Sequence, residues 1–142
     1  MILDNLPQIE LVGLTLYGEA RGEPIEGIVA VGCVIRNRVK FEGSFYAVCL
    51  KPRQFSCWNQ EDPNYSVLLN YAKDLIENDN PLDKYLRQCI WVAQGVVTNC
   101  ILDNTNGSIH YITKKKFEGL RPTWAKSPIN PQVIGNQVFF NV

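Results

Sequence analysis

The sequence predicts a mainly helical α+β domain with a few short strands. Four segments carry apolar residues at helical spacing, and clusters of glycine, proline or asparagine separate them. Only two short segments, both in the last third of the chain, alternate as strands do. A chain of 142 residues fits one domain with a buried core, so residues 1–142 are expected to form a single domain.

The first two helices are predicted at residues 5–21 and 27–39. Gly22 and Pro24 end the first one, because glycine favours a helix C-cap and proline interrupts the backbone hydrogen bonds. The second helix is apolar nearly all round, which is typical of a helix in the centre of a core. Residues 41–60 follow neither period, and we expect them to be irregular.

Two more helices and two strands are predicted in the second half of the chain. Asp62 and Pro63 make a favourable helix start, and apolar residues at helical spacing follow them. A clean apolar stripe predicts another helix at residues 83–99. Residues 108–113 and 137–140 alternate or carry β-forming residues, so we expect both to be extended.

Charge and hydropathy exclude several kinds of partner. The chain carries 14 basic and 14 acidic residues, and a formal net charge of zero argues against a nucleic-acid binder. The basic run at 114–116 is expected in a solvated loop. No apolar run reaches the length of a membrane span, and the N-terminus shows no signal peptide. We expect a monomer that is made in the cytoplasm and does not insert stably into a membrane.

The five cysteines are odd in number and contain no CxxC pair, so neither a zinc site nor a complete disulfide framework is predicted. Cys33, Cys89 and Cys100 fall on the apolar faces of predicted helices, where cysteine acts as a small buried hydrophobe. Cys49 and Cys57 flank a loop and could pair under oxidation, although pairing is not expected. We expect neither a metal nor a cofactor.

Glu19 is the most informative residue of the first predicted helix. At about 100° per residue it projects onto the same face as Val12 and Leu16, so a carboxylate lies on an apolar stripe. Burial there raises the pKa of a carboxyl group, and the negative end of the helix dipole acts in the same direction. A carboxylic acid that stays protonated near neutral pH can protonate the leaving oxygen of a glycoside. Glu19 is therefore a candidate general acid.

Three alternatives for the charged residues stay open. Glu19 could instead form an ion pair with Arg36 or Arg38, or reach solvent where the end of the helix frays. Glu23 could supply a second carboxylate, or it could simply place a negative charge at the start of the next helix. His110, the only histidine, could pair with a cysteine as in a thiol amidase or endopeptidase, but no cysteine-protease signature accompanies it.

Aromatic residues in polar, turn-rich stretches suit sugar binding, because sugar rings present apolar C–H faces and hydroxyl rims. Phe55, Trp58, Tyr111 and Trp124 occupy such stretches, and ordinary packing is the alternative for each. Trp91 lies in a helical stripe region, and we assign it to packing alone.

The longest motif resembles a known family. LYGEARGEP at residues 16–24, EGIVAV at 26–31 and VIRNRV at 34–39 resemble the SleB/CwlJ-type cell-wall hydrolases, a family that includes spore-cortex-lytic enzymes and phage lysins. Weaker resemblances follow at Gln54-Phe55-Ser56, 103–108, Tyr111, Trp124 and 134–136. The chain departs from the family at Gln137, where a histidine is usual, and at Phe139-Phe140.

The resemblance implies a lysozyme-like, lytic-transglycosylase-like domain that cleaves peptidoglycan between N-acetylmuramic acid and N-acetylglucosamine. The catalytic glutamate of the family corresponds to Glu19. The substrate-binding residues that the resemblance implies are Glu23, Gln54, Phe55, Ser56, Asn106, Tyr111 and Trp124.

Several outcomes remain possible for the chemistry. We favour a lytic transglycosylase that leaves 1,6-anhydro ends, with a hydrolytic muramidase as the first alternative. A non-catalytic peptidoglycan-binding or phage structural module is the alternative from another class. The expected place of action is the bacterial cell wall, in the periplasm or outside, and the compact chain resembles a phage lysin more than a spore enzyme.

Overall fold

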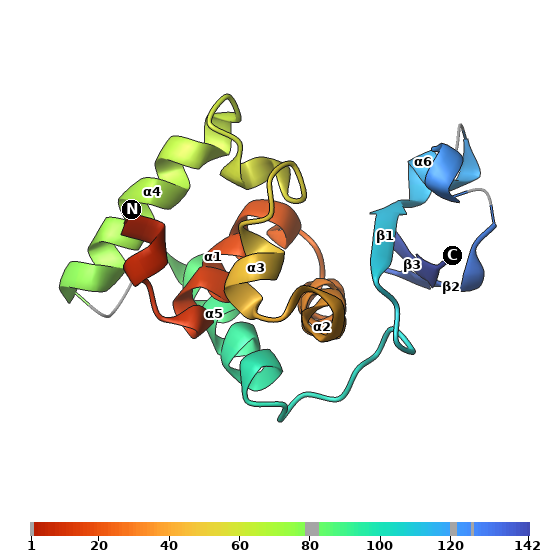
Figure 1. Ribbon diagram of the computed structural model, residues 1–142, viewed down its shortest axis with the longest axis horizontal. Helices are drawn as coiled ribbons and strands as arrows, with labels where there is room; N and C mark the ends of the chain where they lie inside the picture. Colours follow the sequence, from red (N-terminus) through yellow and green to blue (C-terminus); the bar gives the residue numbers. More distant parts are fainter. Residues whose placement is uncertain (1, 79–82, 120–121, 126) are drawn as a thin grey trace.

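The computed structural model describes residues 2–78, 83–119, 122–125 and 127–142. Long helices gather on one side of the molecule, and a small sheet lies beside them (Figure 1). The α-helices are α1 Gln8–Ala20, α2 Ile25–Glu42, α3 Phe45–Cys49, α4 Pro63–Asn78, α5 Lys84–Val97 and α6 Lys114–Glu118. The strands are β1 His110–Thr113, β2 Ile129–Ile134 and β3 Gln137–Asn141, and the short 3-10 helices are η1 Ile2–Asn5, η2 Ser56–Trp58 and η3 Thr123–Ala125.

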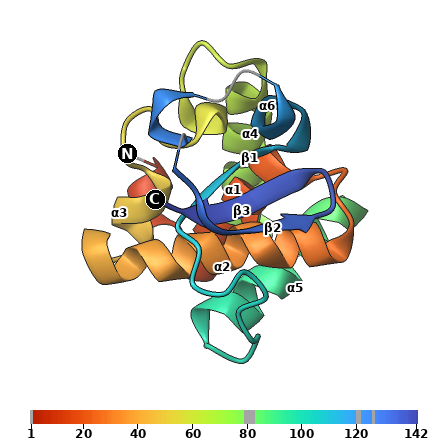
Figure 2. The ribbon, with the colours of Figure 1, turned by 90° about the vertical axis from the view of Figure 1, so that its right-hand side faces the viewer.

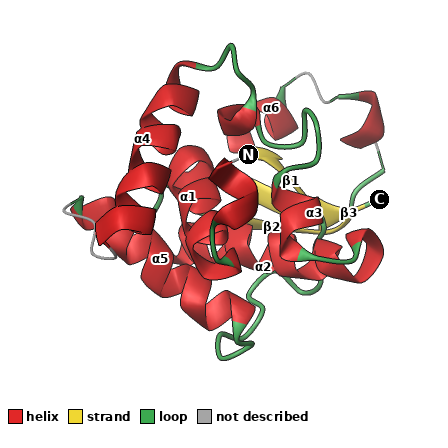
Figure 3. Cartoon of the chain, turned by 60° about the vertical axis from the view of Figure 1, so that its left-hand side comes forward, coloured by secondary structure: helices red, strands yellow, loops and turns green. Residues whose placement is uncertain are grey.

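Helix α1 forms the centre of the helical part, with α2, α4 and α5 around it (Figure 3). Every residue from 11 to 17 is buried, because apolar side chains cover the whole circumference of this stretch. Gly13 allows α5 to approach closely, since a Cβ there would lie 2.7 Å from Cγ1 of Ile90. Residues 30–35 of α2 are also buried without a break, which confirms the predicted core helix. The C-terminal end of α1 is therefore held from several sides.

Asp83 ties three helices together. Its Oδ1 accepts hydrogen bonds from the backbone N–H groups of Tyr85 and Leu86 at 2.9 and 3.0 Å, which caps α5. Its Oδ2 accepts from the hydroxyls of Tyr17 on α1 and Tyr71 on α4 at 3.0 and 2.9 Å. Burial acts to raise the pKa of Asp83, but these hydrogen bonds outweigh it and hold the pKa below the usual value. The carboxylate thus stays charged and fixes α1 against α4 and α5.

The sheet is antiparallel in the order β1-β3-β2, and it lies against α2 (Figure 2). Tyr111 of β1 pairs in register with Phe139 of β3. Because side chains alternate along a strand, Phe139 packs into the main core while Val138 and Phe140 belong to a smaller cluster on the other face. Gly135 takes a φ of 61° in the turn between β2 and β3, a conformation that favours glycine.

Asp103 organises the segment that runs from α5 to β1. Its Oδ1 accepts from the backbone N–H and the hydroxyl of Thr105 at 2.8 and 2.6 Å. Its Oδ2 accepts from the backbone N–H of Gly107 at 2.9 Å and from the side-chain amide of Asn37 at 3.0 Å. Asn37 also donates to the carbonyl of Ser108 at 3.0 Å. A side chain of α2 therefore fixes the loop that delivers β1.

The four predicted helices correspond to α1, α2, α4 and α5, and the two predicted strands correspond to β1 and β3. The expectation of an irregular stretch at 41–60 is wrong in part, because α3 and η2 lie within it. Strand β2 was not predicted, because Pro131 interrupts it and most of its side chains are not buried. Proline is tolerated there because β2 pairs with β3 at the edge of the sheet.

Three further expectations are wrong, one about the lysine run at 114–116, one about Trp91 and one about Cys100. The lysines at 114–116 are exposed as expected, but they begin α6, whose N-cap is the hydroxyl of Thr113. Trp91 is 65% exposed, because the buried stripe of α5 runs through residues on its other side. Cys100 is exposed, since α5 ends at Val97 and the chain then turns away. Cys33 and Cys89 are buried free thiols, as predicted.

Candidate active site

A cavity of about 400 Å³ opens where the end of α1 meets β1 and the loop before η2. Its described lining residues come from distant parts of the chain: Glu19, Arg38, Arg53, Gln54, Phe55, His110, Tyr111 and Trp124. Five of the eight residues that the sequence singled out for a site thus line one cavity: Glu19, Gln54, Phe55, Tyr111 and Trp124.

Glu19 is the second-last residue of α1, and its side chain is half-buried at the cavity wall. Burial raises the pKa of its carboxyl group, and the negative charge of Asp62 raises it further. Hydrogen bonds from the backbone and thiol of Cys57 and from the hydroxyl of Ser56 act in the opposite direction without reversing the shift. The pKa of Glu19 therefore lies above its ordinary value, as the position on the apolar stripe predicted.

The 3-10 turn η2 is held against α1 by two contacts, one from Trp58 and one from Cys57. The indole Nε1 of Trp58 donates to the hydroxyl of Thr15 at 3.0 Å. Gly18 leaves room for Cys57, since a Cβ at Gly18 would lie 2.6 Å from the Cβ and 2.7 Å from the Sγ of Cys57. The donors of η2 are therefore placed at Glu19 by one hydrogen bond and by the close packing of Cys57 on Gly18.

Neither arginine considered as a partner of Glu19 is used in that way. The guanidinium of Arg36 donates to the carbonyl of Val96 at 3.3 Å, and Nε of Arg38 donates to the carbonyl of Ile109 at 2.8 Å. No arginine is among the groups that shift the pKa of Glu19. Burial and the charge of Asp62 thus leave the pKa of the Glu19 carboxyl group above its ordinary value.

The aromatic residues of the cavity play different parts. Trp124 is 48% exposed and stacks on Phe140, with ring centroids 5.8 Å apart and ring planes at 12°. His110 lies beside both rings, 5.4 Å from the centroid of Trp124. Phe55 is buried, and the guanidinium of Arg38 lies 5.8 Å from its ring centroid. Trp124 is therefore the side chain best exposed to meet the face of a sugar ring.

Three predicted site residues lie outside the lining of this cavity. Ser56 sits beside the carboxyl group of Glu19 as a hydrogen-bond donor. The carboxylate of Glu23 accepts hydrogen bonds from the backbone N–H and the side-chain amide of Asn136, at 3.2 and 2.9 Å, and so joins the end of α1 to the β2–β3 turn. Asn106 has a φ of 57° and belongs to the turn that Asp103 organises.

Arg38, Arg53 and His110 are the lining residues that sequence reasoning did not assign to the site. Arg38 was considered only as an ion-pair partner of Glu19 and as part of the VIRNRV motif, at the polar end of an otherwise apolar helix. His110 lay in a segment expected to be extended and was considered only as a partner for a cysteine, whereas Arg53 gave no signal. Within the described ranges, no group of three or more His, Cys, Asp or Glu side chains could hold a metal ion. The helices described here also include none that is long and apolar enough to cross a bilayer.

Comparison with known sequences places the chain in context. The sequence profile of the cell wall hydrolase family matches residues 22–140. A spore cortex-lytic enzyme of Oceanobacillus iheyensis is 44% identical over 61 residues, which cover 37% of this chain and 22% of that protein. The spore cortex-lytic enzyme of Bacillus subtilis is 45% identical over 51 residues, 34% of this chain and 17% of that protein. The chain thus matches about a fifth of the length of these relatives.

Two solved structures share the fold. The catalytic domain of the germination-specific lytic transglycosylase SleB from Bacillus anthracis has a TM-score of 0.63 and 22% identity, over 94% of this chain and 93% of that one. The catalytic domain of the Bacillus cereus SleB protein has a TM-score of 0.60 and 25% identity, over 94% and 89%. The predicted fold class is confirmed. The family match begins just after Glu19, so it does not by itself assign that residue a role. The sequence profile of the cell wall hydrolase family matches most of the chain, residues 22–140, and the chain therefore belongs to this family.

Proposed function

We propose that this chain cleaves the glycan strands of peptidoglycan between N-acetylmuramic acid and N-acetylglucosamine. The observation that carries the proposal is Glu19, a half-buried carboxyl group with a raised pKa at the wall of a cavity of about 400 Å³. The exposed ring of Trp124 in the same cavity suits a sugar substrate. The cell wall hydrolase family and the SleB catalytic domains with this fold support the same chemistry.

In this proposal Glu19 is the general acid. Its raised pKa keeps a larger protonated fraction near neutral pH than an exposed glutamate would have. The carboxyl group gives its proton to the glycosidic oxygen as the bond to C1 of the muramic residue breaks, and an oxocarbenium-like centre develops at C1. The hydrogen bonds from Cys57 and Ser56 then stabilise the carboxylate that is left behind.

We propose that the second step is an internal transfer. The Glu19 carboxylate takes the proton of the muramic C6 hydroxyl, and that oxygen bonds to C1 to give a 1,6-anhydro end. Glu19 is protonated again and no water is consumed. Support comes from the described lining of the cavity, in which Glu19 is the acidic residue. The carboxylate of Glu23 is engaged with Asn136 outside it.

A hydrolytic muramidase is the second candidate, and one observation favours it. Asp62 lies near enough for its charge to raise the pKa of Glu19, so a second carboxylate is present in the neighbourhood. A carboxylate in that position could activate water or stabilise the charge at C1. Asp62 is nevertheless outside the described lining of the cavity, and its Oδ1 accepts from the backbone N–H of Asn64 at 2.8 Å. For this reason we place the transglycosylase first.

The test is to incubate purified peptidoglycan with the wild type and with Glu19→Gln, and to analyse the released fragments by mass spectrometry. Glu26→Gln is the matched control, because it makes the same change at an exposed position at the start of α2. We expect muropeptides from the wild type and the control only. Fragments lighter by one water at the muramic end support the transglycosylase, whereas ordinary reducing ends support the muramidase.

Binding to the sacculus without cleavage by either protein would identify a non-catalytic module instead. The proposed place of action is the bacterial cell wall, in the periplasm or outside. A phage-lysin setting and a monomeric state stay predictions.

A further inference from the structure

The charges that line the cavity are unbalanced. Glu19 is the carboxyl group among its described lining residues, whereas Arg38 and Arg53 both contribute guanidinium groups. Because the pKa of Glu19 is raised, that carboxyl group offsets less positive charge than an exposed one would. A cavity with such a lining attracts a negatively charged group on whatever enters it.

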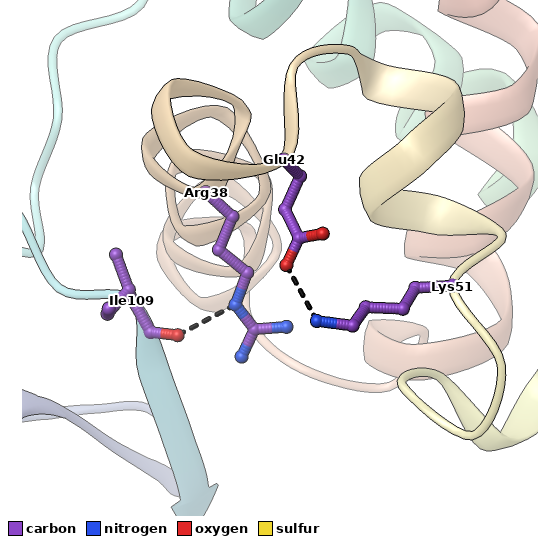
Figure 4. Close-up of polar contacts among 4 residues, drawn as sticks. All are labelled: Arg38, Glu42, Lys51 and Ile109. Atoms are coloured by element: carbon purple, nitrogen blue, oxygen red, sulfur yellow. Dashed lines mark hydrogen bonds and ion pairs between the residues drawn. The ribbon is translucent and has the colours of Figure 1, made fainter.

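Arg38 is held in place by a hydrogen bond to a backbone carbonyl. Its Nε donates to the carbonyl of Ile109 at 2.8 Å, while its Nη1 is buried with no hydrogen-bond partner in the described chain (Figure 4). Glu42 lies one turn further along α2, but its Oε1 pairs with Nζ of Lys51 at 2.9 Å (Figure 4). The charge of Glu42 still acts on Arg38, but the ion pair of Glu42 is with Lys51.

The ring of Phe55 supports the same guanidinium, at 5.8 Å from ring centroid to Cζ of Arg38. The charge of Arg38 also acts on His110, another lining residue. Burial is the main cause that lowers the pKa of His110, and the positive charge of Arg38 lowers it further. A fixed, partly desolvated guanidinium loses little entropy when it binds a planar anion.

Arg53 reaches the cavity from the loop before η2. Its backbone has a φ of 64°, a conformation that costs energy in any residue other than glycine. Its side chain is exposed, and Arg53 and Gln54 both line the cavity. Strained backbone of this kind concentrates at ligand sites, where it places a side chain that the relaxed loop would not.

We propose that Arg38 and Arg53 bind a carboxylate of the glycan strand, and so make the site selective for muramic-acid strands over neutral N-acetylglucosamine polymers. The inference rests on the proposed function and names the substrate group that the cavity recognises. Peptidoglycan offers two sources of that group: the lactyl side chain of muramic acid, when it carries no peptide, and the carboxylates of an attached stem peptide. In each case a planar anion matches the fork of a guanidinium.

The experiment compares four substrates for the wild type: strands stripped of peptides, peptide-bearing strands, and each of these after methyl esterification of its carboxylates. The readout is kcat and KM for release of fragments. We expect KM to be about tenfold lower on a carboxylate substrate than on its ester, the size of one charge-assisted hydrogen bond. The ratio of KM on the ester to KM on the carboxylate substrate should fall toward one in Arg38→Gln and in Arg53→Gln. Rising salt concentration should reduce the same ratio in the wild type.

Lys73→Gln is the matched control, because it removes one positive charge from an exposed position of α4 outside the cavity. Arg38→Lys keeps the charge and loses the fork, so it restores part of the preference if charge contributes. Arg53→Gln alters an exposed side chain and keeps the test valid if Arg38→Gln fails to fold.

A preference in the stripped strands identifies the lactyl carboxylate, and a preference confined to peptide-bearing strands identifies the stem peptide. Equal KM values for acid and ester in both pairs, with cleavage intact, would overturn the inference and leave the proposed function standing. A wild type that cleaves none of the four substrates would overturn the proposed function itself.

Discussion

Gly18 and Cys57 lie so close together that a Cβ on Gly18 would be 2.6 Å from the Cβ of Cys57 and 2.7 Å from its Sγ. Real side chains do not approach so closely, so any larger residue at position 18 must push η2 away from α1. Because η2 carries the hydrogen-bond donors at Glu19, this contact couples the packing of the core to the candidate general acid.

Gly18→Ala is therefore expected to lower both stability and activity. The overpacked contact should cost about 1–3 kcal/mol of unfolding free energy, and the displaced donors should reduce kcat at least about tenfold. Gly13→Ala is the matched control, because it overpacks α1 against Ile90 at 2.7 Å, away from η2. Urea unfolding and kcat are measured below both melting temperatures. Equal loss of kcat in the two variants would contradict a specific role for the contact at Cys57.

The pH profile of activity should follow the raised pKa of Glu19. A general acid must be protonated, so kcat/KM is expected to fall on the alkaline side, at a pH above the ordinary value of 4.5 for a glutamate. Asp62→Asn removes a negative charge that raises this pKa, so the alkaline limb should move to lower pH. Rates of fragment release over a pH series give both curves. An unchanged limb in Asp62→Asn would show that the two carboxyl groups do not interact.

The same shift predicts that Glu19→Gln stabilises the fold at neutral pH. A pKa that is higher in the folded than in the unfolded state contributes stability below the unfolded value near 4.5, and that contribution is lost as pH rises through the folded pKa. The neutral amide avoids this loss. Thermal unfolding should show a higher Tm for Glu19→Gln at pH 8, with the difference shrinking below pH 4.5. A lower Tm at pH 8 would mean that the carboxylate is favourably bound.

Glu23 gives a test of its two interpretations. If it mainly joins α1 to the β2–β3 turn, Glu23→Ala and Asn136→Ala should each cost about 1 kcal/mol, and the double variant should cost less than the sum. KM for peptidoglycan should stay within about twofold in that case. A rise in KM without a coupling energy between the two substitutions would instead support substrate binding by Glu23.

The thiols test the remaining enzyme class. Burial raises the pKa of the Cys57 thiol, and the charge of Glu19 raises it further, so Cys57 does not form a thiolate readily. Native protein treated with iodoacetamide should be labelled at the exposed Cys100 and keep its activity. Mass spectrometry of peptides locates the label. Loss of activity in Cys57→Ala with cleavage intact in Glu19→Gln would favour a thiol amidase.

The sequence located most of the helices because their signals are local. Apolar spacing gave α1, α2, α4 and α5, and the stripe that includes Val12 and Leu16 correctly marked Glu19 as half-buried. The sequence patterns did not predict features that depend on contacts distant in the chain. Strand β2 is an edge strand interrupted by Pro131, and Trp91 is exposed next to the buried face of α5.

Local sequence patterns are enough to predict the helical architecture, the family resemblance and a carboxyl group on an apolar helix face. The residues that surround this carboxyl group are known only from the folded chain. Arg38, Arg53 and His110 come from α2, a strained loop and β1, and no spacing along the chain relates them to Glu19. The physical reason is that a helix or strand follows from neighbours in sequence, whereas a cavity forms where separate elements pack, and its charges depend on which partners that packing leaves within reach.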